Sequence, residues 1–229
     1  MDGTDSVVER VYEQLKAMTV SYQFKPGERL NESDIAKLLG ISRTPLREAL
    51  NRLNTGGFLR FMPGKGFFCR ELDAQEIFDL YELRKSIEVG AVRLAVKRAK
   101  DADIESLLAF LDATGPDPGQ RSAVELVEFD ETFHERLIIM SQNAEMLNVL
   151  RNVNARIRFV RWIDMDRINR SNTQAEHRAV LAGLGARDEA TCVAVLEKHI
   201  DRRLDQITSA IKEGYAQIYM PTAHVPRAR

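Results

Sequence analysis

The chain has 229 residues, 44% of them hydrophobic and 29% charged, which is ordinary globular composition with room for one or two domains. Its two cysteines, Cys69 and Cys192, lie far apart and in no metal-like spacing, so a disulfide framework is excluded. The N-terminus is acidic, and no apolar run approaches the roughly 20 residues that span a bilayer. We therefore expect a cytoplasmic protein with no membrane partner.

The charge is unevenly distributed along the chain. The formal net charge is only −1, but the segment from Lys25 to Arg70 carries nine basic residues against four acidic ones. A local basic surface on a nearly neutral chain favours a nucleic-acid-binding module joined to a part with another task.

The first third of the chain predicts three helices. An amphipathic helix is expected from Ser6 to about Tyr22, because its apolar residues recur at helical spacing. Asn31 can cap a second helix, which Gly40 ends. Ser42 can cap a third helix directly after this end. Pro45 is compatible with that helix because it falls in the first turn. Two helices joined by a short turn form a helix-turn-helix pattern.

The third helix directs polar side chains away from its core face. Arg43, Arg47 and Asn51 recur every four residues, and in a major groove Arg suits guanine while Asn suits adenine. Thr44 lies at the helix N-terminus, where hydroxyl and backbone N–H groups favour phosphate. Exposed arginines are also common on helices that bind nothing, so this pattern alone leaves both interpretations open.

A predicted hairpin strengthens the DNA-binding interpretation. Its strands are expected over 58–62 and 66–70, with Pro63-Gly64-Lys65-Gly66 as the turn. Glycines there allow close backbone approach to a ligand, and Lys65 can reach a phosphate or the minor groove.

The run from Gly40 to Leu50, Gly-Ile-Ser-Arg-Thr-Pro-Leu-Arg-Glu-Ala-Leu, resembles the signature of the GntR family of bacterial transcription regulators. This resemblance implies a winged helix-turn-helix. It also implies base or phosphate contacts from Arg43, Thr44, Arg47 and the wing glycine Gly64.

The rest of the chain predicts an antiparallel helical bundle. Its helices are expected over roughly 73–99, 101–113, 122–141, 145–166, 173–186 and 188–215. The fold class is thus mainly α, with a winged helix-turn-helix over 1–72, a helical domain over 73–220 and a loose tail over 221–229.

Three of the four histidines, His134, His177 and His199, lie on the apolar faces of their predicted helices, and Asp130 precedes His134 by one turn. Together they can supply three nitrogens and one oxygen to a metal ion inside the bundle. The alternative is that each is a hydrogen-bonded core residue, as single buried histidines usually are.

The segments around these four residues resemble the metal-bearing segments of the FCD ligand domain, which follows the winged helix in the fatty-acid-regulator branch of the GntR family. The resemblance implies that Asp130, His134, His177 and His199 are the metal ligands. The metal it implies is zinc, nickel or manganese, which this ligand set does not distinguish.

Arginines suggest a ligand for the bundle. Arg84 lies on an apolar stripe, where it can bind a carboxylate effector or form a buried salt bridge with Glu88, one turn on. Arg156 and Arg161 flank the apolar stripe of a later helix, and we assign them to the effector site as well.

These observations predict a regulator, not an enzyme. We expect a homodimeric repressor that binds a palindromic double-stranded DNA operator and senses a small carboxylate metabolite at its metal site. The alternatives are that the helical domain is a metal-dependent hydrolase-like enzyme, or that it carries a purely structural metal and no effector.

Overall fold

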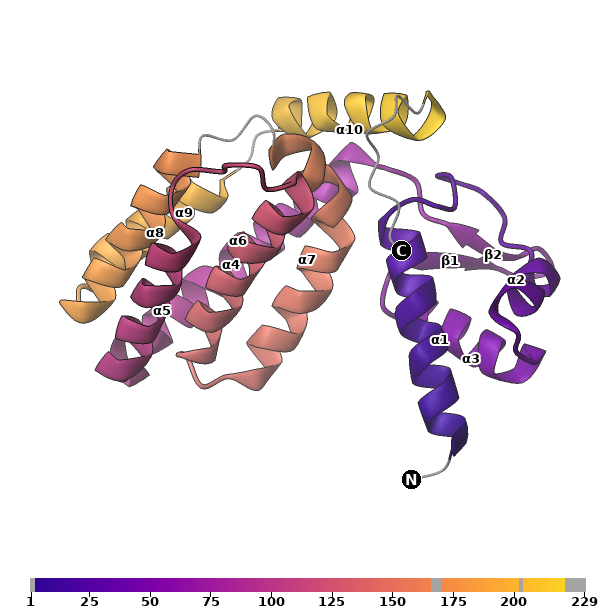
Figure 1. The fold of residues 1–229 in the computed structure, drawn as a ribbon, viewed down its shortest axis with the longest axis horizontal. Helices are drawn as coiled ribbons and strands as arrows, with labels where there is room; N and C mark the ends of the chain where they lie inside the picture. Colours follow the sequence, from indigo (N-terminus) through magenta and orange to yellow (C-terminus); the bar gives the residue numbers. More distant parts are fainter. Residues whose placement is uncertain (1–2, 166–169, 202–203, 221–229) are drawn as a thin grey trace. The chain divides into compact units, whose positions relative to one another are not determined.

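The computed structural model describes residues 3–165, 170–201 and 204–220. Within them lie ten helices and one two-stranded sheet, which confirms the mainly helical fold (Figure 1). The chain divides into two compact units, one of residues 1–73 together with 214–229 and one of residues 74–213. The end of the expected helical domain, from Gly214, therefore groups with the first unit. The predicted loose tail at 221–229 lies outside the described residues.

The first unit is built around its third helix. It contains α1 (Gly3–Val20), α2 (Glu32–Leu39), α3 (Arg43–Thr55), β1 (Leu59–Met62) and β2 (Gly66–Cys69). Helices α1 and α2 and strand β1 all pack against α3. The apolar residues of α3 that fill this core are Leu46, Ala49, Leu50 and Leu53.

Local sequence explains where α2 and α3 begin and end. The side chain of Asn31 accepts hydrogen bonds from the backbone N–H groups of Ser33 and Asp34, and Gly40 ends α2 with a φ of +63°. Ser42 occupies the position before α3, but its side chain makes no capping hydrogen bond, unlike the cap that the sequence suggests. Pro45 fits in the first turn of α3, where backbone N–H groups have no helical partner.

The hairpin forms as predicted and is one residue shorter at each outer end. Its antiparallel strands pair Leu59 with Cys69 and Met62 with Gly66. Gly64 has a φ of +74° in the turn, a conformation that L side chains rarely adopt.

The second unit is a helical bundle. It comprises α4 (Ala74–Arg98), α5 (Asp101–Thr114), α6 (Ala123–Ile139), α7 (Ala144–Met165), α8 (Arg170–Gly185), α9 (Glu189–Ile200) and the start of α10 (Leu204–Tyr219). Helix α4 contacts α6, α7 and α9, while α8 packs against α5 and α9 (Figure 1). No described helix combines the length and hydrophobicity needed to cross a membrane.

The prediction of one helix over 188–215 is wrong, because the chain forms α9 and α10 instead. Asp201 leaves the helix with φ −56° and ψ 131°, and its carboxylate accepts a 2.8 Å hydrogen bond from Lys85 of α4. No glycine or proline in the sequence marks this break. The break leaves His199 in the last turn of α9.

The main apolar core of the bundle collects side chains from α4, α5, α6, α8 and α9. Its buried members include Val92, Leu107, Phe133, Leu181 and Leu196. Phe133 directly precedes His134, and its ring stacks on that of His177 at 3.7 Å between centroids. The apolar core therefore fixes one side of the polar cluster described next.

Candidate metal and nucleic-acid sites

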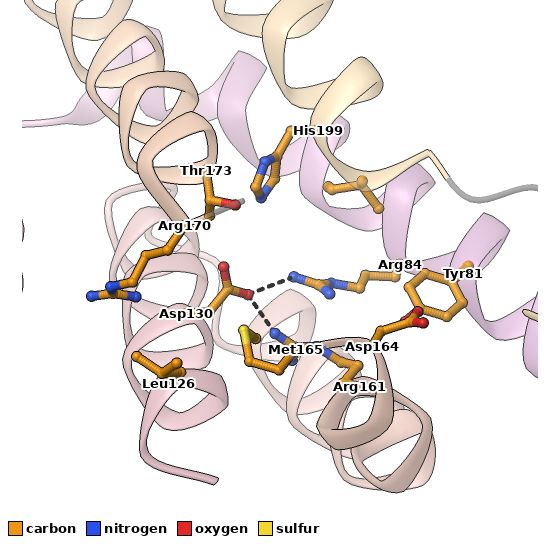
Figure 2. A pocket seen from close by; sticks show the side chains of 11 residues that line it. Tyr81, Arg84, Leu126, Asp130, Arg161, Asp164, Met165, Arg170, Thr173 and His199 are labelled. Atoms are coloured by element: carbon orange, nitrogen blue, oxygen red, sulfur yellow. Dashed lines mark hydrogen bonds and ion pairs between the residues drawn. The ribbon is translucent and has the colours of Figure 1, made fainter. Parts of the chain in front are cut away.

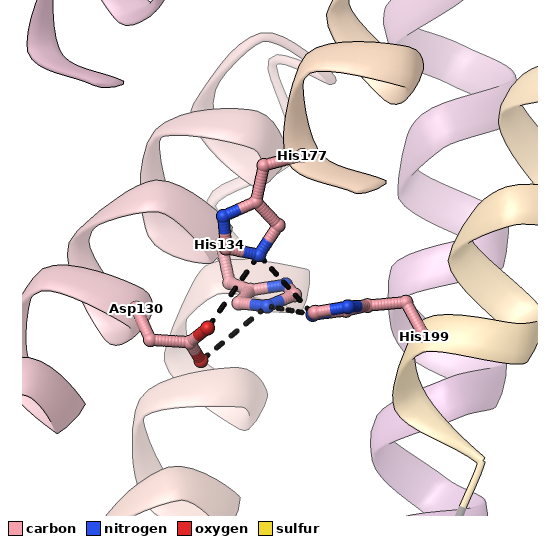
Figure 3. A group of neighbouring side chains, drawn as sticks. All are labelled: Asp130, His134, His177 and His199. Atoms are coloured by element: carbon pink, nitrogen blue, oxygen red, sulfur yellow. Dashed lines mark hydrogen bonds and ion pairs between the residues drawn. The ribbon is translucent and has the colours of Figure 1, made fainter. Parts of the chain in front are cut away.

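The structure brings together the four residues that the sequence suggests as metal ligands. Asp130 and His134 project from α6, His177 from α8 and His199 from α9 (Figure 3). One ligand atom from each residue lies within 4.8 Å of all the others. The i, i+4 spacing on α6 and the packing of α8 against α9 produce this convergence.

The distances between these atoms fit a metal ion. The Nε2 atom of His199 lies 3.2 Å from Nε2 of His134 and 3.1 Å from Nε2 of His177. The Asp130 carboxylate oxygens lie 3.5 Å from Nε2 of His134 and of His177. Ligands held 2.0–2.1 Å from a tetrahedral ion are separated by roughly 3.3 Å, so the donor set matches in chemistry and in spacing.

Burial controls the charge of these groups. Burial lowers the pKa of His134 more than the adjacent Glu88 raises it, and burial likewise takes the pKa of His177 well below its usual value. Burial alone would raise the pKa of Asp130, but the nearby histidines and Arg161 outweigh it and take that pKa well below its usual value. These shifts favour neutral His134 and His177 and an ionised Asp130, the protonation states that bind metal.

Two glutamates contact the far side of the histidine rings. The Nδ1 atom of His134 lies 2.5 Å from Glu88 Oε2, and that of His199 lies 2.8 Å from Glu176 Oε2. Sequence reasoning placed Glu88 only beside Arg84 and missed Glu176. The available signal was the position of Glu176 directly before His177, on a helix that carries a ligand.

The buried salt bridge expected as the alternative role of Arg84 is present. Arg84 is 5% exposed and donates a 2.7 Å hydrogen bond from Nε to Glu88 Oε1. Its Nη2 atom lies 3.9 Å from Asp130 Oδ2. Burial opposes ionisation of Glu88, but His134 and Arg84 outweigh it and lower the pKa of Glu88 to about 2.

Arg161 is also buried beside the cluster. It hydrogen-bonds Asp130 and lies 3.1 Å from Glu131 Oε1. Arg156 is not part of this arrangement, because it donates a 2.7 Å hydrogen bond to Glu76 on α4. The structure therefore separates Arg156 from the other two arginines assigned to the effector.

A pocket adjoins the cluster (Figure 2). Its walls contain Asp130 and His199 but neither His134 nor His177, so the pocket meets the cluster at Asp130 and His199. The residues lining it are Tyr81, Arg84, Leu126, Asp130, Arg161, Asp164, Met165, Arg170, Thr173, His199 and Ile200.

Sequence reasoning missed several of these lining residues. Arg170 and Thr173 begin the helix that carries His177, and helical spacing places Arg170 two turns before it. The guanidinium of Arg170 donates to the backbone carbonyls of Gly115 and Thr114, which ties α8 to the end of α5. The helical spacing of Arg170 and Thr173 relative to His177 was the sequence signal that could have identified these two residues.

In the first unit, the side chains predicted to contact DNA are solvent-exposed on α3. They are Arg43, Thr44, Arg47 and Asn51. Arg43 donates to the Ser33 hydroxyl at 3.1 Å, and the 59%-exposed Arg47 side chain lies 3.4 Å from Glu32. An exposed pair of this kind contributes little to stability, so Arg47 can exchange Glu32 for another partner at small cost.

The hairpin tip is equally accessible. Gly64 and Lys65 are exposed, and a Cβ atom added at Gly64 would meet nothing within 4 Å. The tip can therefore approach a nucleic-acid backbone closely.

Comparisons with known proteins assign both parts of the chain. Residues 7–69 match the family described as bacterial regulatory proteins, gntR family, and residues 79–202 match the FCD domain. The chain belongs to the GntR family. The matches confirm the winged helix-turn-helix followed by an FCD domain that the sequence signature predicts.

Relatives of this GntR regulator are similar over nearly the whole chain. The Nta operon transcriptional regulator of Aminobacter aminovorans is 46% identical over 92% of this chain and 99% of its own. The uncharacterized HTH-type transcriptional regulator YdhC of Bacillus subtilis is 30% identical over 89% of this chain and 92% of its own. The solved structure of E. coli McbR/YncC has the same fold, with a TM-score of 0.66 at 22% identity over 94% of this chain and all of that one.

These relatives are transcription regulators and not enzymes, which confirms the prediction against a catalytic function. The GntR regulator described here thus joins a DNA-binding module to an FCD effector-binding domain.

Proposed function

We propose that this GntR regulator is a metabolite-responsive repressor that binds a palindromic operator as a homodimer and senses a small carboxylate at a metal ion. The observation that carries the proposal is the convergence of Asp130 and three histidines beside a pocket that Asp130 and His199 line together with Arg84 and Arg161.

Asp130, His134, His177 and His199 would hold the metal, with zinc, nickel and manganese all suited to this donor set. When bound, the ion supplies a Lewis-acidic position for a ligand carboxylate. The pocket reaches the cluster beside Asp130 and His199, so an effector would approach there.

Arg84 and Arg161 supply the second half of the effector site. Both line the pocket, and a guanidinium binds a carboxylate through paired N–H donors. Each already has an acidic partner, Glu88 for Arg84 and Asp130 with Glu131 for Arg161. An effector carboxylate would compete with these acids, and this competition gives ligand binding a route to the positions of α4, α6 and α7.

Operator recognition is assigned to α3 and the hairpin. Arg43, Arg47 and Asn51 would read base edges in the major groove, while Thr44, Gly64 and Lys65 would contact the backbone or the minor groove. A homodimer would place two such modules on the half-sites of a palindrome. Because its partner is DNA, we place the protein in the cytoplasm.

Effector binding would regulate the operator by shifting a population. A ligand that binds one arrangement of the helical domain better than another favours that arrangement, and by linkage it changes operator affinity. The relative that controls the Nta operon supports a role at an operon for this chain as well.

The proposal is tested with the metal-loaded protein and a library of small carboxylates, followed by thermal unfolding, with His134→Ala as the control. We expect one chemical class to stabilise the wild type and to lower its operator affinity, and the variant to show neither effect. If no carboxylate shifts either protein while the metal still raises the unfolding temperature, the metal is structural and the sensing role is wrong.

A further inference from the structure

The three histidines of the cluster differ in the hydrogen-bond partner of Nδ1, the ring nitrogen that faces away from the other ligands. Nδ1 of His134 faces Glu88, which is fully buried, and Nδ1 of His199 faces Glu176. Nδ1 of His177 is buried and has no hydrogen-bond partner among the described residues, and that ring stacks on Phe133. The cluster therefore contains two oriented histidines and one without such an anchor.

A carboxylate selects the tautomer of the imidazole that it contacts. An ionised carboxylate only accepts hydrogen bonds, so Nδ1 of His134 and of His199 must carry the proton. In a ring that carries its one proton on Nδ1, Nε2 keeps its lone pair, and the two Nε2 atoms face each other at 3.2 Å. Two lone pairs at that distance repel, and a cation between them removes the repulsion.

We propose that Glu88 and Glu176 are positioning residues that fix His134 and His199 as Nδ1-protonated tautomers, so that both present Nε2 to a metal ion. The inference deepens the metal site of the proposed function and rests on it. It assigns a task to two acids that themselves lie outside the ligand set.

Each glutamate has a second partner, which is Asn172 for Glu176 and the pocket-lining Arg84 for Glu88. The Oε1 atom of Glu88 accepts from Nε of Arg84 at 2.7 Å while its Oε2 atom faces His134. Glu88 therefore connects the arginine on the pocket wall to a metal-ligating ring through two direct contacts. An anion that draws Arg84 away from Glu88 leaves more negative charge on the partner of His134, so effector binding and metal affinity are coupled in both directions.

The first test is Zn²⁺ affinity, measured by competition with a chromophoric chelator. We expect Glu88→Gln and Glu176→Gln each to weaken Zn²⁺ binding by roughly 10–100-fold, because an amide is a weaker partner and can turn its NH₂ group toward Nδ1. The matched control is Glu189→Gln on α9, which removes only an exposed ion pair with Arg93 and should leave the affinity unchanged. Unchanged affinity in both test variants would overturn the inference.

The second test reads the tautomers directly by ¹⁵N NMR of the metal-free protein. We expect His134 and His199 to be Nδ1-protonated in the wild type, with only His134 altered in Glu88→Gln and only His199 altered in Glu176→Gln. An Nε2-protonated His134 in the wild type would contradict the proposal. A wild type that binds no Zn²⁺ would refute the proposed metal site, and the tautomer spectra would still decide the role of the glutamates.

Glu88→Gln leaves Arg84 buried without its main acidic partner, and the variant can fail to fold for that reason. The double variant Arg84→Met with Glu88→Gln removes both charges and keeps the test available for His134. Glu176 is partly exposed, so Glu176→Gln tests His199 without this risk.

Discussion

The polar cluster of the helical unit and the exposed face of α3 use the same side-chain chemistry in opposite surroundings. In the cluster, Glu88 and His134 are both 0% exposed. Because they contact each other, each limits the role that the other can have. On α3, the Arg47 side chain is 59% exposed and forms an exposed ion pair with Glu32, so its surroundings say little about its role. A buried polar group needs a hydrogen-bond partner, so its contacts indicate its role. An exposed polar group needs none, so its role must be inferred from its spacing and motif in the sequence.

The largest difference should appear when one ion pair is broken in each region. Arg161→Met removes a buried cation from Asp130 and Glu131, while Arg84 stays 3.9 Å from Asp130 and Arg158 stays paired with Glu131. We expect the metal-free protein to lose about 1.5–3 kcal/mol of unfolding free energy. Arg52→Ala breaks an exposed pair with Glu9 and should cost about 1 kcal/mol or less. Urea unfolding measures both, and equal losses would remove the contrast between the regions.

Acidification should lower the folding stability of the protein through the groups of the cluster before it affects the exposed face of α3. The folded-state pKa values of His134 and His177 are lowered, so the unfolded chain binds more protons below about pH 6.5 and stability falls there. The pKa of Glu88, lowered to about 2, and that of Asp130 extend the loss from about pH 4.5 downward. Chemical unfolding of metal-free protein from pH 8 to pH 4 checks this. A stability that rises on acidification would contradict the assigned protonation states.

The exposed arginines should matter for DNA and not for folding. If Arg47 reads a base, Arg47→Ala weakens operator binding by about 1–3 kcal/mol, or roughly 5- to 150-fold, at unchanged thermal stability. Fluorescence anisotropy with operator DNA measures the change, and Arg178→Ala in the helical domain serves as the control. Equal, small effects of both substitutions would show that Arg47 is an ordinary solvated side chain.

The smallest expected effect compares two helix caps on the same surface. Asn31→Ala removes a side chain that accepts from two backbone N–H groups of α2 and should cost about 1 kcal/mol. Ser42→Ala should cost only a few tenths of a kcal/mol, because the Ser42 side chain makes no capping hydrogen bond. Thermal unfolding of both variants resolves the difference, and a larger loss for Ser42→Ala would contradict the capping geometry.

Periodicity and capping chemistry predicted most of the fold. They located the helix-turn-helix, the hairpin and most bundle helices, because apolar spacing reports directly on burial. They failed at Asp201, where α9 ends although no glycine or proline in the sequence marks a break.

The ligands of the candidate metal site were predictable from the sequence, but the contacts around them were not. Spacing identified Asp130 and the three histidines, which the structure brings together. It did not identify Glu176, nor the contact of Glu88 with His134, because these depend on which helices become neighbours. It also assigned Arg156 to the effector site, and the structure pairs this residue with Glu76 outside the lining of the pocket.

The central claim is that Asp130, His134, His177 and His199 bind one metal ion. Titration of chelator-treated protein with Co²⁺, followed by visible absorption, tests it most directly. We predict one ion bound per chain with the d–d absorption of nitrogen and oxygen ligation, and loss of that absorption in His134→Ala. Absence of bound Co²⁺ in the wild type, or an unchanged spectrum in the variant, would contradict the assignment.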